Sequence, residues 1–311
     1  MILYTFVVSY RMTKTLVIIL AETREAEVTF NNFKMNVLDE LKADLCVCIG
    51  IKPSYDYTNP MWMNAKYKFT YNEPVDYSTA FDEAFDQIAK ENKNVNIFPW
   101  RNYLQIRDQF LGGVLCDDKS LQHDGSAGIL IFFRWFLLQQ LKVNGLLDIY
   151  DRFIITRSDF VYELPHPSMN ILNKDYIWVP NGEQYGGVTD RHVVLSKTTV
   201  EPYLNIFEKF ILEKQTYFDK MKLTNKWNLE QVIKFHLEAN SVFDKVKFFP
   251  YIMYSVRSPT GTTRWSKGSY NDKLGLYVKY KTEYDSSHYN KNLFLQSKND
   301  NMDLFYMTFI K

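Results

Sequence analysis

The fold is decided by a stretch near the middle of the chain, Tyr150-Asp151-Arg152-Phe153-Ile154-Ile155-Thr156-Arg157-Ser158-Asp159-Phe160. A helix-like segment ends just before it, a short apolar strand follows, and the carboxylate of Asp159 stands where that strand stops. In an open α/β sheet, ligands bind outside the carboxyl ends of the strands, so we expect Asp159 at a binding site. Asp151 precedes Asp159 by about 26 Å of extended chain, which places it at the opposite edge of the sheet.

A carboxylate at a strand end suggests an enzyme that holds a metal ion and a diphosphate. The chain has no G-x-x-x-x-G-K-[ST], no G-x-G-x-x-G after its first strand, no G-x-S-x-G and no H-E-x-x-H. Their absence argues against P-loop hydrolases, dinucleotide oxidoreductases, serine hydrolases with a nucleophile elbow, and zincins. The alternative for Asp159 is a structural role, in which the carboxylate only caps the following turn.

Composition indicates an ordinary globular chain. It has 311 residues, of which 46% are apolar and 23% charged, and α/β domains of this length can be undivided. The net charge of +1 gives no support to bulk nucleic-acid binding, which needs a basic face. Three cysteines argue against a disulfide framework. Cys46 and Cys48 are expected as buried thiols on one face of a strand, and the protein as intracellular and cytoplasmic.

The first residues are apolar but do not predict a membrane span. Arg11 and Lys14 interrupt the apolar runs, which stay well below the roughly 20 residues that cross a bilayer. A signal peptide would begin with basic residues and end at a cleavage site of small residues, and neither is found. We expect an extra strand here, or an extension that precedes a start at Met12.

Further along, apolar runs and helical spacing alternate. Buried strands are expected at residues 15–20 and 43–50, with a helix at 29–41 between them; this β-α-β order is typical of nucleotide-binding domains. The remaining expectations are a long loop at 52–73, helices at 77–92, 125–143, 199–217 and 228–239, and strands at 95–98, 176–179, 192–196 and 246–253. We predict an α/β fold with a mostly parallel central sheet flanked by helices. One domain is expected over 1–265, with halves at about 15–160 and 161–265, and a C-terminal extension over 266–311 that closes over a ligand.

Three segments could contact a nucleotide, two in the first half of the chain and one in its C-terminal tail. The turn at residues 21–24 follows the first strand, and its Arg24 could pair with a phosphate or stack on a base; the alternative is an exposed turn. His123 and Asp124 precede the helix at 125–143, whose free N–H groups could face a ligand; the alternative is a structural cap. The tail contains Arg257, Arg264, Trp265 and Lys267, and mobile basic loops often fold onto a leaving diphosphate. A solvated basic tail is the alternative there.

The loop at residues 181–192 looks most like a site in the second half. Gly186 and Gly187 would let the backbone pass close to a substrate, and three ionisable residues follow. Asp190 could act as a general base, Arg191 as an anion clamp and His192 as a hydrogen-bonding group. A β-turn would explain the glycines but not the charges. Near residue 228, Asn-Leu-Glu opens a helix, and capping accounts for this pattern.

Taken in order, residues 16–24, 43–50, 153–160 and 185–192 resemble GT-A type glycosyltransferases, over roughly residues 15–265. Within that class the chain is similar to enzymes encoded by chlorella viruses, with a xylosyltransferase that extends a fucose of the capsid glycan as the closest likeness. This resemblance implies a UDP-linked nucleotide-sugar donor, a glycan acceptor such as a capsid-protein N-glycan, a divalent cation (Mn²⁺ or Mg²⁺), and the host cytoplasm.

The resemblance also implies roles for residues. Asp159 matches the last position of the D-x-D-like strand end that holds the cation, while Arg157 replaces the first carboxylate, which puts metal dependence in doubt. Asp190 matches the base of inverting members. The nucleotide-sugar would contact Ala21, Glu22, Thr23, Arg24, Gly50, Arg134, Arg157, Ser158, Asp159, Arg257 and Lys267. The acceptor would contact Tyr185, Gly186, Gly187, Arg191, His192 and Glu230.

Three other classes stay open. A retaining glycosyltransferase would need no base, and Asp190 would then orient the substrate. A non-catalytic glycan- or nucleotide-binding capsid accessory protein would not need Asp159. A nucleotidyltransferase would share the fold and the metal but usually has a Gly-rich loop after its first strand, and residues 21–24 contain no glycine.

Overall fold

A computed structural model describes residues 13–106, 110–114, 125–224, 227–261, 263, 266–297 and 301–310. Its centre is a seven-stranded sheet in the order β3-β2-β1-β4-β7-β6-β8. The strands in that order are β3 (Tyr67–Asn72), β2 (Asp44–Ile51), β1 (Thr15–Ala21), β4 (Arg152–Thr156), β7 (Val193–Ser196), β6 (Ile177–Pro180) and β8 (Val246–Phe249). Only β7 runs antiparallel to its neighbours in this sheet. The expected α/β fold with a mostly parallel sheet is therefore confirmed.

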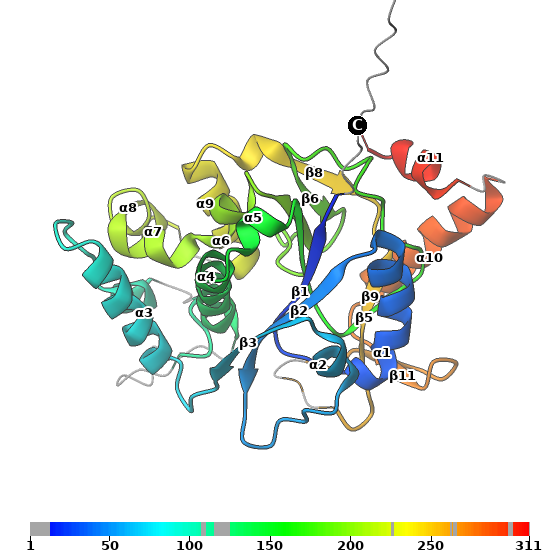
Figure 1. The fold of residues 1–311 in the computed structure, drawn as a ribbon, viewed down its shortest axis with the longest axis horizontal. Helices are drawn as coiled ribbons and strands as arrows, with labels where there is room; N and C mark the ends of the chain where they lie inside the picture. Colours follow the sequence, from blue (N-terminus) through cyan, green and yellow to red (C-terminus); the bar gives the residue numbers. More distant parts are fainter. Residues whose placement is uncertain are drawn as a thin grey trace, which may run out of the picture.

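Helices cover both faces of this sheet, and β1 is therefore buried on both sides. Leu16 and Ile18 face a layer of α3 (Ser78–Glu91), α4 (Ala127–Val143), α6 (Val200–Leu204), α7 (Ile206–Leu212) and α9 (Leu229–Ala239). Val17 and Ile19 face α1 (Ala26–Phe33), its π-helical continuation η1 (Lys34–Asp39), α2 (Pro60–Asn64) and α11 (Met302–Met307). In Figure 1, α4 and α1 lie on opposite sides of β1 and β2. Short helical segments are η2 (Trp100–Gln105), α5 (Leu146–Ile149), α8 (Phe218–Met221) and η4 (Phe243–Lys245).

The C-terminal extension joins the fold through a second, four-stranded antiparallel sheet. Its order is β10 (Ser269–Asn271), β11 (Leu276–Val278), β9 (Met253–Arg257) and β5 (Phe160–Tyr162). The long helix α10 (Lys281–Gln296) follows β11 and packs against β9. β5 begins one residue after Asp159, so this sheet brings the extension to the end of β4.

Several expected elements differ from the structure. The segment at 52–73 holds α2 and β3 as well as loops; β3 is an edge strand with only Phe69 buried, so its apolar pattern is weak. Residues 95–98 form no strand, and Phe98 contributes one backbone hydrogen bond to Ile211 (2.8 Å). The run at 246–253 is split at Pro250 into β8 and β9, which belong to different sheets. Proline has no backbone N–H to donate to a neighbouring strand.

Other expectations hold. Cys46 and Cys48 are buried free thiols on one face of β2. Asp151 lies at the start of β4, where its carboxylate accepts a hydrogen bond from the Lys14 amide (3.0 Å). Across the described ranges, no helix has both the length and the apolar character that crossing a bilayer requires. Residues 1–12, expected as a strand or an extension, lie outside the described ranges.

Candidate functional site

A cavity of about 400 Å³ opens at the carboxyl ends of β1 and β4, where the sequence predicts the ligand. Leu20 and Ala21 contribute the end of β1, and Ile155 and Thr156 contribute the end of β4. The first turn of α4 adds Ser126, Ile129 and Leu130. Tyr77, Ser158 and Thr263 also line it, and the remaining lining residues are all charged: Glu22, Arg24, Lys52, Glu73, Arg157, Asp159, Asp190 and Lys279.

The turn after β1 is held in an unusual backbone conformation. Ala21 (φ 72°) and Glu25 (φ 59°) both occupy the left-handed region, which side chains other than glycine rarely adopt. The Ser158 hydroxyl donates to the carbonyls of Glu22 (3.2 Å) and Arg24 (2.7 Å). Ser158 therefore fixes the turn next to Asp159. Thr23 does not line the cavity, and its hydroxyl is 2.9 Å from the Tyr55 hydroxyl.

Asp159 is buried and fully engaged by arginine side chains. Arg157 donates from Nε to Oδ1 (2.8 Å) and from Nη2 to Oδ2 (2.7 Å), and Nη1 of the fully buried Arg257 also donates to Oδ2. Burial alone would raise the pKa of Asp159, but these guanidinium groups outweigh it and hold the pKa well below its ordinary value. Asp159 is thus ionised and serves as the counter-ion of two arginines.

These contacts do not fit the expected metal site. A cation would need carboxylate oxygens that face open space, whereas both oxygens of Asp159 face guanidinium groups. Within the described part of the chain, no cluster of three or more His, Cys, Asp or Glu side chains could hold a metal ion. The structure therefore does not support the prediction that Asp159 is a metal ligand, since Arg157 and Arg257 engage both of its carboxylate oxygens.

The end of the cavity around Asp159 is cationic. Burial, together with repulsion from Arg157 and Arg257, lowers the pKa of Arg24 to about 10 even though Asp159 acts in the opposite direction. Arg24 is also paired with the more exposed Glu22. Burial and the same arginines lower the pKa of Lys279 to about 7. Groups with such perturbed pKa values in a cleft are typical of functional sites.

Lys279 was not expected from the sequence, which favoured Lys267 in the same tail. The Lys267 ammonium donates to the Pro259 carbonyl (2.6 Å) and does not line the cavity. Lys279 reaches the cavity because β11 pairs with β9 and the Lys279 amide donates to the Ser255 carbonyl (2.9 Å). A basic residue between a short strand and a helix was the only signal in the sequence. Arg264, Trp265, His123 and Asp124 lie outside the described residues.

Asp190 provides a carboxylate in the same cavity. Its side chain is half-buried, and no hydrogen bond or ion pair engages it among the described residues. Arg134 lies beneath it, fully buried, and donates to the Asp190 carbonyl (3.3 Å). Because it does not line the cavity, Arg134 is placed to support Asp190 and not to contact a nucleotide. Burial and the charge of Asp190 raise the pKa of the neighbouring Glu230 to about 7.

The glycines of the loop contact a helix. A Cβ on Gly187 would lie 2.0 Å from the Glu230 carbonyl oxygen, and the Val188 amide donates to that same oxygen (3.0 Å). Gly186 has φ 81° and lies beside Gln231. The expectation that Gly186 and Gly187 admit a substrate is therefore corrected, since they let the loop dock on the start of α9. This docking brings Glu230 to Asp190.

The residues after Asp190 point into the protein. Arg191 is buried and pairs with Glu283 (2.6 Å) and Glu183 (3.3 Å), so it has no free face for an acceptor. His192 is fully buried, with Nδ1 2.9 Å from the Thr156 hydroxyl and Nε2 3.2 Å from Nε2 of His166. Neither Arg191 nor His192, both expected to contact the acceptor, lines the cavity. Tyr185 is half-exposed.

The far wall of the cavity comes from β2 and the loop after β3. Lys52 pairs with Glu73 (3.6 Å) across it, and Tyr77 lies beside them. Gly50 is behind this wall, since a Cβ there would meet the Tyr77 hydroxyl (3.2 Å) and the Glu73 carboxylate (3.3 Å). Gly50 thus allows these side chains to approach the sheet, and it does not line the cavity.

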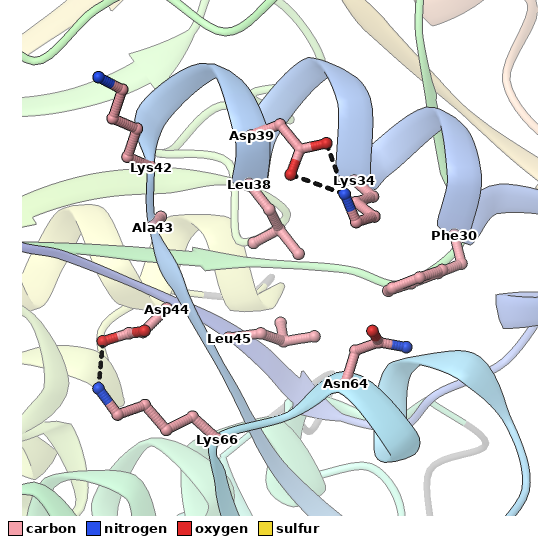
Figure 2. Close-up of a pocket in the computed structure, with 10 residues that line it drawn as sticks. All are labelled: Phe30, Lys34, Leu38, Asp39, Lys42, Ala43, Asp44, Leu45, Asn64 and Lys66. Carbon is pink, nitrogen blue, oxygen red and sulfur yellow. Dashed lines mark hydrogen bonds and ion pairs between the residues drawn. The ribbon is translucent and has the colours of Figure 1, made fainter.

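A second hollow lies at the opposite end of β2, under α1 and η1 (Figure 2). Ion pairs join Lys34 to Asp39 and Lys66 to Asp44, both at 2.6 Å. These charges neutralise one another, and the hollow is at the amino end of the strand, where open α/β sheets do not bind ligands. The cavity beside Asp159 is the better candidate site.

No protein-family model matches the chain, and no curated protein matches it either. Among solved structures, the chain is similar to mouse xyloside xylosyltransferase 1 in its apo form. The two share 10% sequence identity with a TM-score of 0.34, over 76% of this chain and 84% of that one. A likeness at this level carries no argument about activity, which has to be inferred from the cavity itself.

Proposed function

We propose that this protein is a glycosyltransferase that moves a sugar from a nucleotide-sugar to a hydroxyl of a glycan. The observation that supports this most is the make-up of one cavity, which combines a cationic end around Asp159 with the unpaired carboxylate of Asp190. Transfer from a sugar diphosphate requires both features: positive charge for the leaving group and a base for the attacking hydroxyl.

The chemistry balances with these two groups. The acceptor oxygen attacks C1 of the donor sugar, its proton passes to the Asp190 carboxylate, and the new C1–O bond forms as the bond from C1 to the diphosphate oxygen breaks. The nucleoside diphosphate departs with that electron pair, and Arg24, Arg157 and Lys279 stabilise its negative charge. Attack from the face opposite the leaving group inverts the configuration at C1.

The finer identity of the substrates is taken from the sequence resemblance. It predicts a UDP-linked donor, xylose as the sugar and a capsid-protein N-glycan of a chlorella-type virus as the acceptor, made in the host cytoplasm. A non-catalytic glycan- or nucleotide-binding protein would bind in the same cavity without turnover, and a retaining enzyme would give the opposite anomer. The two experiments below separate these alternatives.

The first experiment compares Asp190→Asn with the wild type. Donor binding, measured by calorimetry with UDP-sugars, is expected to stay within about twofold, while turnover falls by about 10²–10⁴-fold, as loss of a general base predicts. Asp175→Asn, an exposed carboxylate before β6, is the matched control and should keep full turnover. Near-normal turnover in Asp190→Asn would exclude the base role.

The second experiment determines the product anomer by NMR. An α-linked donor that yields a β-linked product supports inversion. An α-linked product assigns the chain to the retaining class and makes Asp190 an orienting residue. If nucleotide-sugars bind but no transfer or hydrolysis occurs with any donor and acceptor pair, the non-catalytic alternative holds.

A further inference from the structure

The role of Asp159 follows from what surrounds it. Its carboxylate accepts two hydrogen bonds from Arg157 and one from Arg257, and Arg257 is completely buried. Nε and Nη2 of Arg257 have no hydrogen-bond partner within the described ranges. An aspartate held in this way fixes the direction of its arginines and is closed to a metal ion. Asp159 therefore holds together two guanidinium groups from distant parts of the chain, those of Arg157 and Arg257.

Positive charge exceeds negative charge at this end of the cavity. Arg157 and Arg257 both lower the pKa of Arg24 and the pKa of Lys279, and Asp159 acts on these two groups in the opposite direction. Glu22 pairs with Arg24 from the exposed side, and Asp190 acts on Arg157 from further along the cavity. Burying like charges together is costly unless an anion joins them. In the free protein the repulsion among these positive charges is therefore unfavourable, and a bound anion would reduce it.

Lys279 is the cation best placed to meet that anion. Its backbone is fixed to β9 by the hydrogen bond to Ser255, its side chain lines the cavity, and its ammonium has no hydrogen bond or ion pair in the part of the chain that is described. Tyr280 flanks it at 5.3 Å from the ring centre. Arg157 also lines the cavity, with Nη1 left over after its two bonds to Asp159.

We propose that the protein binds the diphosphate of its donor without a metal ion, with Lys279, Arg157 and Arg24 as the phosphate ligands. Asp159 and Arg257 are positioning residues that hold Arg157 in place. This inference rests on the proposed function, since it names the groups that bind the donor. It differs from the cation-dependent site that the sequence resemblance implies, and it gives the C-terminal extension a direct part in donor binding.

Isothermal titration with UDP and with inorganic pyrophosphate tests the proposal, in EDTA and in Mn²⁺ at equal ionic strength. Both probes are expected to bind equally well in the two buffers. Lys279→Met should weaken binding of both by about tenfold or more, the usual effect of losing one charge-assisted hydrogen bond. Lys281→Met removes an exposed charge two residues away, paired only with Asp285 in the described structure, and should leave binding unchanged.

Three results would overturn the inference. Binding of UDP that appears only with Mn²⁺ would show that a metal holds the diphosphate, and would leave the proposed function intact. Unchanged affinity in Lys279→Met would remove that residue from the site. Absence of binding by UDP, GDP, CMP and pyrophosphate in both buffers would reject the donor site and the proposed function together.

Discussion

The carboxylate of Glu283 on α10 and the guanidinium of Arg191 form a buried ion pair, with Nη1 and Oε1 2.6 Å apart. Glu283 also accepts hydrogen bonds from the Tyr251 hydroxyl (3.0 Å) and the Ser255 amide (2.8 Å). Arg191 directly follows Asp190, and Glu283 belongs to the helix that begins just after Lys279. One buried contact therefore links the proposed base to the proposed phosphate ligand.

The first prediction concerns this pair. Glu283→Gln keeps the shape of the side chain but leaves the buried Arg191 with Glu183, at the longer distance of 3.3 Å, as its remaining acidic partner, so the free energy of unfolding should fall by up to about 3–5 kcal/mol. Urea denaturation followed by circular dichroism measures it. Asp285→Asn on the same helix, an exposed partner of Lys281, should change stability by less than about 0.5 kcal/mol. Equal effects in both variants would mean that the buried pair contributes nothing specific.

The second prediction tests the docking of the loop on α9. An added methyl group in Gly187→Ala would overlap the Glu230 carbonyl, so the loop must move, at a cost of about 1–3 kcal/mol. Gly275→Ala is the control, since it has open space around it and φ 65° and should cost only about 1 kcal/mol of backbone strain. Turnover should fall in Gly187→Ala alone, because only that change displaces Asp190. Full turnover there would separate the loop from catalysis.

The third prediction uses the pKa of Glu230, which burial and Asp190 raise to about 7. Between the ordinary pKa of a glutamate and pH 7, the folded state binds more protons than the unfolded state, so this group's contribution to stability falls as pH rises. Glu230→Gln removes the ionisable carboxyl group, so the variant does not lose this part of its stability as pH rises. The variant should match the wild type near pH 4 and exceed it by about 1–3 kcal/mol at pH 8, given about 1.4 kcal/mol per pKa unit.

Chemical denaturation at pH 4, 6 and 8 measures this difference. Glu238→Gln, which changes an exposed residue on the same helix, is the matched control. A difference between Glu230→Gln and the wild type that stays constant from pH 4 to pH 8 would contradict the raised pKa and the proximity of the two carboxylates.

The parts of the fold that the sequence predicted are those determined by local patterns. Residues 15–20 and 43–50 are continuous apolar runs because β1 and β2 are buried on both faces. β3 was missed because an edge strand needs only one buried residue, here Phe69. The strand at 246–253 was drawn too long because its apolar residues continue past Pro250 into a different sheet.

For the candidate site, the sequence predicted where Asp159 lies but not which side chains contact it. Asp159 was expected at the carboxyl edge of the sheet because it follows a predicted strand, and the structure has it there, in the lining of the cavity. Its metal role was not supported because the partner that closes it, Arg257, arrives from a strand 98 positions later. Lys279 was missed for the same reason, since it reaches the cavity only through the pairing of β11 with β9. His192 looked like part of a charged loop, yet it is fully buried immediately before β7.

The fourth prediction concerns the pH dependence of donor binding. Lys279 faces Arg157, Arg257, Arg24 and Asp159, and its pKa of about 7 means that the free protein loses this charge as pH rises through neutrality. The diphosphate favours the protonated form, so UDP binding should take up a proton above pH 7 and weaken by up to about tenfold per pH unit between pH 7 and 9. The phosphate groups have second pKa values near 6 and are already ionised in this window.

Lys279→Arg is the informative variant here, because a guanidinium keeps its charge across the whole range. It should bind UDP with nearly constant affinity from pH 7 to pH 9, while the wild type declines. Titrations in buffers of different ionisation enthalpy should detect proton uptake in the wild type only. A wild-type affinity that does not change over this range, or the same decline in Lys279→Arg, would place the titrating group elsewhere and leave Lys279 without a part in holding the diphosphate.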